Sequence, residues 1–179
     1  FEEIHRNAAI AYGVFDYIRH TQDWGYLAEG GFEVLLGISR FWSQRVNWSE
    51  EKEAYVMLGV TGPNEYENNI NNNWYTNRMA AWTLEWTLEA HNWLAENAAD
   101  ALSAITSKTA LNADTEFAKW NDIIAKMYYP KSEKLGVILQ QDGFLEKEQL
   151  TADDLSLDEL PINQNWSGGG IWRAIFIKQ

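Results

Sequence analysis

The chain has 179 residues, 46% of them hydrophobic, which is enough for one domain with a substantial core. Its net charge of −12 argues against a nucleic-acid partner, because a phosphate backbone needs a basic surface. The absence of Cys excludes disulfides and thiolate metal sites and suits a cytoplasmic enzyme, and no apolar run approaches membrane-spanning length.

Two helices are predicted at the start of the chain. Residues 3–20 and 26–45 carry apolar side chains at helical spacing, with turn and capping residues at 21–23 between them. His5 and Glu3 lie near each other at the first helix and could face a cleft, although a lone His at a helix start is more often structural. A short apolar run at 55–58 then predicts a strand.

A third helix is predicted at 75–97, and its apolar residues fall on two opposite faces. Such a helix is packed on both sides, as an inner helix of a layered all-α fold would be. One face is aromatic, and we interpret its Trp residues as core rather than as a sugar platform. This face comprises Tyr75, Met79, Trp82, Trp86 and Trp93.

The second half of the chain is less regular. Residues 103–111 are weakly polar and predict a surface connection, a fourth helix spans 114–128 before Pro130, and 135–139 predict a short strand. Residues 142–170 are expected to be mostly irregular. They contain a solvated acidic loop whose spacing is not that of a calcium site, so we expect no metal there; its residues are Asp153, Asp154, Asp158 and Glu159.

The stretch GVTGPNEYENNINNNWYTN, residues 59–77, lies between apolar segments and holds seven Asn. It can be a long surface connection. However, Gly62-Pro63 fixes a turn before Glu65, and amide side chains and the rings of Tyr66, Trp74 and Tyr75 are close in sequence. A carboxyl held among them and partly out of water would have its neutral form favoured, as a general acid in glycoside cleavage requires. Ten Trp and eight Tyr also suit a sugar-binding cleft.

The same stretch closely resembles the catalytic-acid motif of the inverting disaccharide phosphorylases, the family of the maltose, trehalose and kojibiose phosphorylases. Other segments resemble that family in the right order, and together they cover nearly the whole chain. They are FEEIHRNAAIAYGVFDYIRHT at the start, then LQQDGFLEKE, LPINQNWS and FIKQ.

The resemblance implies an all-α fold that is part of an (α/α)6 barrel, with short β segments in its loops. Residues 1–179 would be the central portion of this single catalytic domain, with the flanking β-sandwich and C-terminal domains absent. The chain ends at residues 177–179 with no cap or polar tail, which also indicates a piece of a larger protein. The resemblance implies a homodimeric parent.

The family's site residues carry over at three positions. Glu65 matches the general acid, and Lys178 and Gln179 match a pair that contacts sugar. The family's upstream Trp-Asp motif and its downstream phosphate-binding loop lie outside this sequence. The chain departs from the family at Gly168–Gly170, where three Gly would weaken a helix by about 1 kcal/mol each, and this affects the alignment of Trp172 and Arg173.

The function implied is phosphate-dependent cleavage of an α-linked glucose disaccharide, with maltose the first choice. Glu65 would protonate the glycosidic oxygen while inorganic phosphate, the co-substrate, attacks the anomeric carbon from behind and gives β-glucose 1-phosphate and glucose. No cofactor or metal is implied. Two alternatives stay open: an inverting hydrolase of related fold, which needs a second carboxylate as base, and an inactive fragment that only binds sugar. We expect the isolated chain to be inactive.

Overall fold

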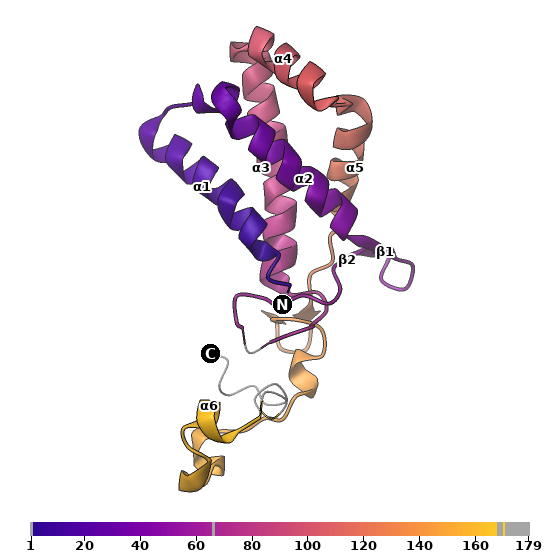
Figure 1. Cartoon of the computed structure of the whole chain (residues 1–179). Coiled ribbons are helices and arrows are strands. Elements are labelled where there is room, and N and C mark those ends of the chain that lie inside the picture. The colour runs from indigo at the N-terminus through magenta and orange to yellow at the C-terminus, as the bar shows by residue number, and fades with distance from the viewer. Residues whose placement is uncertain (1, 66, 168–169, 171–179) are drawn as a thin grey trace.

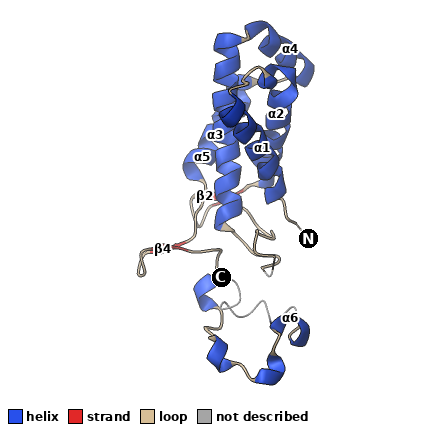
Figure 2. Ribbon diagram, turned by 90° about the vertical axis from the view of Figure 1, so that its left-hand side faces the viewer, coloured by secondary structure: helices blue, strands red, loops and turns tan. Residues whose placement is uncertain are grey.

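The computed structural model describes residues 2–65, 67–167 and 170. Five helices form a bundle: α1 (His5–Thr21), α2 (Phe32–Arg45), α3 (Trp74–Asn97), α4 (Ala99–Thr109) and α5 (Ala113–Lys126). Helix α4 lies across one end of the bundle, and the part of the chain after α5 extends away from the other end (Figure 1). The loop that joins β2 (Ala54–Val56) to α3 and the loop that joins β3 (Lys131–Ser132) to β4 (Val137–Ile138) lie at the end from which the chain extends (Figure 2). The fold is all-α with short strands in its loops, as the sequence predicted.

The first two helices are α1, His5–Thr21, and α2, Phe32–Arg45. The predicted helix at 26–45 is broken near its start, because Leu27–Gly31 forms a π-helical turn in which Gly30 has a φ of 150°. A residue with a Cβ rarely adopts that angle, whereas Gly does so without steric cost. The break lets α2 leave α1 at a new angle and pack against α3 (Figure 1).

Helix α3, Trp74–Asn97, is the inner helix of the bundle. It packs against α1, α2, α4 and α5, so the prediction from its two apolar faces is confirmed. Trp86 is 3% exposed, and Trp82 and Trp93 pack against the buried core. The interpretation of these three rings as core is therefore also confirmed.

Helix α4, Ala99–Thr109, occupies the segment predicted to be a surface connection, and that prediction was wrong. The segment is rich in Ala, the best helix former, and Ile105 is buried against the core while Leu102 packs on it. Ala110 ends the helix with a φ of 51° and leads into α5, Ala113–Lys126, the predicted fourth helix.

Two hairpins supply all the strands in the described part of the chain. Strand β1, Asn47–Ser49, pairs antiparallel with β2, Ala54–Val56, and β3, Lys131–Ser132, pairs antiparallel with β4, Val137–Ile138. The strands predicted at 55–58 and 135–139 overlap β2 and β4. A bridge between Tyr55 and Met127 ties the first hairpin to the end of α5.

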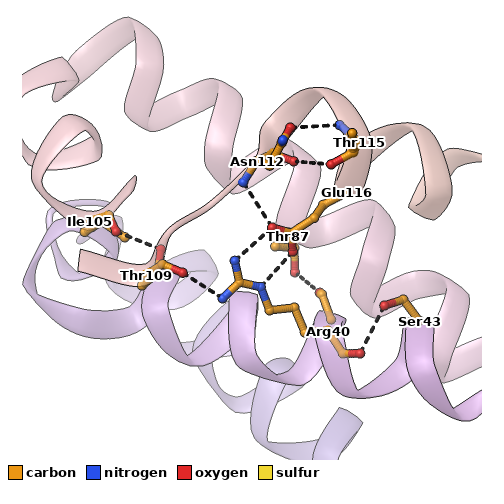
Figure 3. Close-up of polar contacts among 9 residues, drawn as sticks. Arg40, Ser43, Thr87, Ile105, Thr109, Asn112, Thr115 and Glu116 are labelled. Atoms are coloured by element: carbon orange, nitrogen blue, oxygen red, sulfur yellow. Dashed lines mark hydrogen bonds and ion pairs between the residues drawn. The ribbon is translucent and has the colours of Figure 1, made fainter. Parts of the chain in front are cut away.

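An ion pair joins α2 to α5 on the outside of the bundle. Arg40 Nε and Nη2 donate to the two carboxylate oxygens of Glu116 at 2.7 and 2.8 Å, and Arg40 Nη1 donates to the carbonyl of Thr109 (Figure 3). Hydrogen bonding from Arg40 holds the pKa of Glu116 below its usual value. Arg40 thus fastens three helices together, because Thr109 ends α4.

The region after β4 is a series of short turns that ends in α6, Ile162–Asn165. Its acidic side chains bond to their own turns: Asp154 accepts from Thr151 N at 2.7 Å and Glu159 from Ser156 N at 2.9 Å. Within the described ranges, no cluster of three or more His, Asp or Glu could hold a metal ion. Likewise, none of the described helices has the length and apolarity needed to span a membrane.

Candidate active site

The Asn-rich loop is closed at its base by two backbone hydrogen bonds. Val60 and Ile70 exchange N–H···O bonds of 2.9 Å, so residues 61–65 and 67–69 project from this bridge. The loop is also attached to the start of the chain, because Thr61 N donates to Glu2 O and His5 Nδ1 lies 3.2 Å from Thr61 O. His5, considered as a cleft residue from sequence, therefore holds the loop in place.

The Asn side chains build the loop. Asn72 accepts from Met57 N at 3.0 Å, Asn71 accepts from Gly59 N at 3.0 Å, and Asn73 caps α3 by accepting from Thr76 N at 2.9 Å. Asn72 also has a φ of 53°, a left-handed conformation that Asn tolerates better than most residues. The amides thus take the place of backbone partners in a segment that is neither helix nor sheet.

Gly62 lies directly on the Asn73 cap. A Cβ at this position would come within 2.6 Å of Asn73 Nδ2, so a larger residue would displace the cap or the turn. The Asn73 amide also donates to Gln140 O at 3.3 Å. One side chain therefore joins the loop, the first turn of α3 and the segment after β4.

Glu65 lies at the tip of a turn closed by a 3.0 Å bond from Glu67 N to Asn64 O, and it is exposed. The sequence interpretation expected its carboxyl to be partly out of water, and this is wrong because the residue is exposed. Asn68 donates to the backbone oxygen of Glu65, and the amides of Asn71, Asn72 and Asn73 accept from the backbone N–H groups of Gly59, Met57 and Thr76. The role of Glu65 as general acid stays a prediction.

Two residues further on, Glu67 has the opposite environment. It is fully buried and forms an ion pair with Lys147, whose Nζ lies 2.6 Å from Glu67 Oε2 and whose side chain is 14% exposed. Sequence reasoning missed this pair, since charged residues in a polar loop are usually solvated. The only signal in the sequence is that Glu67 belongs to the same Asn-rich motif.

A pocket of about 440 Å³ adjoins the loop, within the ~300–1,000 Å³ range of small-molecule sites. It has ring and aliphatic surfaces together with three amide side chains, the combination that sugar sites use. Glu65 directly follows Asn64, one of the residues that line the pocket, in the sequence. The lining consists of Pro63, Asn64, Asn73, Trp74, Tyr75, Ile138, Leu139 and Gln140.

The predicted sugar-contacting pair, Lys178 and Gln179, lies outside the described residues, as do Trp172 and Arg173. Gly170 is described, whereas the other two residues of the Gly run are not. The site that the structure places therefore consists of the Glu65 turn, the buried Glu67–Lys147 pair and the pocket beside them.

The whole chain, residues 1–179, matches the profile of the glycosyl hydrolase family 65 central catalytic domain. This chain belongs to glycosyl hydrolase family 65. A solved structure described as a candidate kojibiose phosphorylase from the human microbiome has the same fold, with a TM-score of 0.83 over 97% of this chain and 25% of that one at 24% identity. The fold is thus part of an (α/α)6 barrel.

The curated relatives that the chain matches include phosphorylases of several disaccharides. The chain is 49% identical over its full length to maltose phosphorylase of Bacillus subtilis. It is 33% identical over 177 residues to kojibiose phosphorylase of Halothermothrix orenii and 34% identical over 185 residues to alpha,alpha-trehalose phosphorylase of Thermoanaerobacter brockii. These matches cover 99–100% of this chain but 23% of each relative, so the chain spans about a quarter of their length.

Proposed function

We propose that this chain is the central portion of the catalytic domain of an inverting α-glucoside phosphorylase, with maltose as its disaccharide. The observation that carries the choice of maltose is the gradation in identity: 49% to a maltose phosphorylase against 33% and 34% to kojibiose and trehalose phosphorylases. The only protein partner that we propose is a second copy of the parent chain. The small-molecule partners are a disaccharide and inorganic phosphate.

The proposed chemistry uses Glu65 as the proton donor. Its exposed position lets a glycosidic oxygen approach within hydrogen-bond distance, which a general acid requires. Protonation of that oxygen releases one glucose as the bond to the anomeric carbon breaks. Phosphate, already an anion at neutral pH, forms the new bond from the opposite face and needs no base. Sugar contacts by Lys178 and Gln179 belong to the same proposal.

The pocket beside the loop supports a sugar ligand. Tyr75 is 40% exposed and lines the pocket with Trp74, so ring faces are available for the C–H faces of a pyranose. The neighbouring amides of Asn64 and Gln140 are of the type that bonds sugar hydroxyls. No metal or cofactor enters this mechanism, and a cytoplasmic location is part of the proposal.

The test is to supply the full-length protein that carries this chain with maltose, kojibiose or trehalose, each with and without inorganic phosphate. We expect β-glucose 1-phosphate and glucose from maltose only when phosphate is present. Two glucose molecules released without phosphate would establish the hydrolase alternative instead. Faster phosphorolysis of kojibiose or trehalose than of maltose would overturn the choice of disaccharide while leaving the reaction type intact.

A further inference from the structure

The buried pair of Glu67 and Lys147 joins the turn that bears Glu65 to a segment 80 residues away in sequence. Glu67 N donates to Asn64 O at 3.0 Å and so closes that turn through its backbone, while its side chain is anchored by Lys147. The ion pair therefore restrains Glu67, which closes the turn that bears Glu65.

Lys147 is itself held in place. It directly follows a 3-10 turn, Phe144–Glu146, and its N–H bonds to Phe144 O. The start of the same segment is attached to the loop by two further contacts: Asp142 N donates to Asn71 O at 3.1 Å, and Asn72 Nδ2 donates to Asp142 Oδ2 at 2.7 Å. The loop is thus fixed to this segment at Glu67 and again at Asn71 and Asn72.

A buried ion pair is a poor way to stabilise a fold, because the cost of removing two charges from water offsets most of their attraction. A pair of apolar residues of similar size would do as well or better for stability alone. The pair does fix the distance between the turn that contains Glu67 and the segment that contains Lys147. This is useful beside a group that has to meet a substrate oxygen, since a misplacement of ~1 Å can cost about 10²-fold in rate.

Resting on the proposed function, we propose that Glu67 and Lys147 are positioning residues that hold the Glu65 turn in the geometry for proton transfer. Neither residue exchanges a proton with the substrate in this assignment. Loss of either charge frees the turn and lowers kcat more than it raises KM, because Asn64 alone of the residues that line the sugar pocket belongs to this turn.

The experiment compares Glu67→Gln, Lys147→Met, Lys147→Arg and the double variant Glu67→Gln/Lys147→Met in the full-length enzyme, with maltose and phosphate as substrates. We expect Glu67→Gln and Lys147→Met each to lower kcat about 10²-fold, the double variant to lose no more than either single one, and Lys147→Arg to keep most of the activity. Glu116→Gln, which breaks an ion pair outside the site, is the matched control and should leave kcat unchanged.

Three results would overturn the assignment. Unchanged kcat in folded Lys147→Met would show that the pair is purely structural. A loss in Glu67→Gln that far exceeds the loss in Lys147→Met, with Glu65→Gln still active, would make Glu67 the proton donor. Additive losses in the double variant would show two separate roles. If Glu67→Gln does not fold, a comparison of kcat between Lys147→Met and Lys147→Arg still decides whether the ion pair positions the turn. Absence of phosphorolysis by the wild-type enzyme would refute the proposed function independently of all four variants.

Discussion

The helical bundle and the Asn-rich loop are held together by different forces. In the bundle, apolar side chains such as Trp120 and Leu84 are fully buried, and ion pairs such as Arg40–Glu116 lie at its periphery. In the loop, directional hydrogen bonds from backbone N–H groups to Asn side-chain oxygens fix the backbone, and one ion pair is buried. Apolar burial has no preferred direction, whereas hydrogen bonds set positions. The bundle therefore determines the stability of the fold, and the loop determines the positions of the residues at the candidate site.

Replacing Glu65 with Gln gives the largest expected effect and tests the loop side of this comparison. The change keeps the shape of the side chain but removes the proton, so we expect kcat on maltose to fall by about 10²–10⁴-fold in the full-length enzyme. The melting temperature should not change, because the side chain is exposed. Steady-state phosphorolysis and a thermal melt check both. A glucosyl donor whose leaving group needs no proton should be affected much less, and turnover of maltose at the wild-type rate would remove Glu65 from the mechanism.

Replacing Trp120 with Ala tests the bundle side. The ring is 1% exposed and packs against Phe117, so its removal should lower the free energy of unfolding by about 3–5 kcal/mol. We expect kcat per folded molecule to stay unchanged below the new melting temperature. Urea unfolding followed by Trp fluorescence, together with an active-site titration, measures the two quantities. Trp120→Phe is the control with a smaller loss, and a fall in kcat at full folding would contradict the separation of roles.

Two Asn caps allow a matched comparison between the regions. Asn73 caps α3 in the loop and Asn112 caps α5 in the bundle, each through its side-chain oxygen. Replacement of either by Ala should cost about 0.5–2 kcal/mol of unfolding free energy. Only Asn73→Ala should also lower kcat/KM, since this side chain contacts Gln140 and lines the pocket. Equal kinetic effects in the two variants would mean that helix capping alone explains both.

The smallest expected effect is the pH dependence of the Arg40–Glu116 pair. The pKa of Glu116 is lowered in the folded protein, chiefly by its hydrogen bond from Arg40, relative to an ordinary value of 4.5. The stabilisation is therefore fully present above about pH 4.5 and is lost as the pH falls through the folded-state value. Melting temperatures between pH 7 and pH 3 should fall less steeply in Glu116→Gln than in the wild type. Parallel curves would show that the pair adds nothing measurable to acid sensitivity.

The sequence predicted the bundle better than the loop. Helices α1, α3 and α5 follow from the spacing of apolar residues, which is a local signal. Helix α4 was missed because its polar Ser and Thr obscured the spacing of Leu102 and Ile105. In the loop, the composition identified the motif but did not predict which group each Asn side chain would bond. Whether an Asn bonds a carboxyl or a backbone group depends on partners such as Met57 and Thr76, and the Glu67–Lys147 pair depends on a contact 80 residues apart.

The use of amides in the loop also has a consequence for how the site responds to proton concentration. An acid catalyst gains and loses a proton in each cycle, and its activity changes with pH for that reason. Asn side chains do not titrate, so the contacts that Asn68, Asn71 and Asn73 make with neutral groups keep the same strength across that range. The proposed mechanism makes the proton concentration act on Glu65, whereas much of the framework around Glu65 does not change with pH.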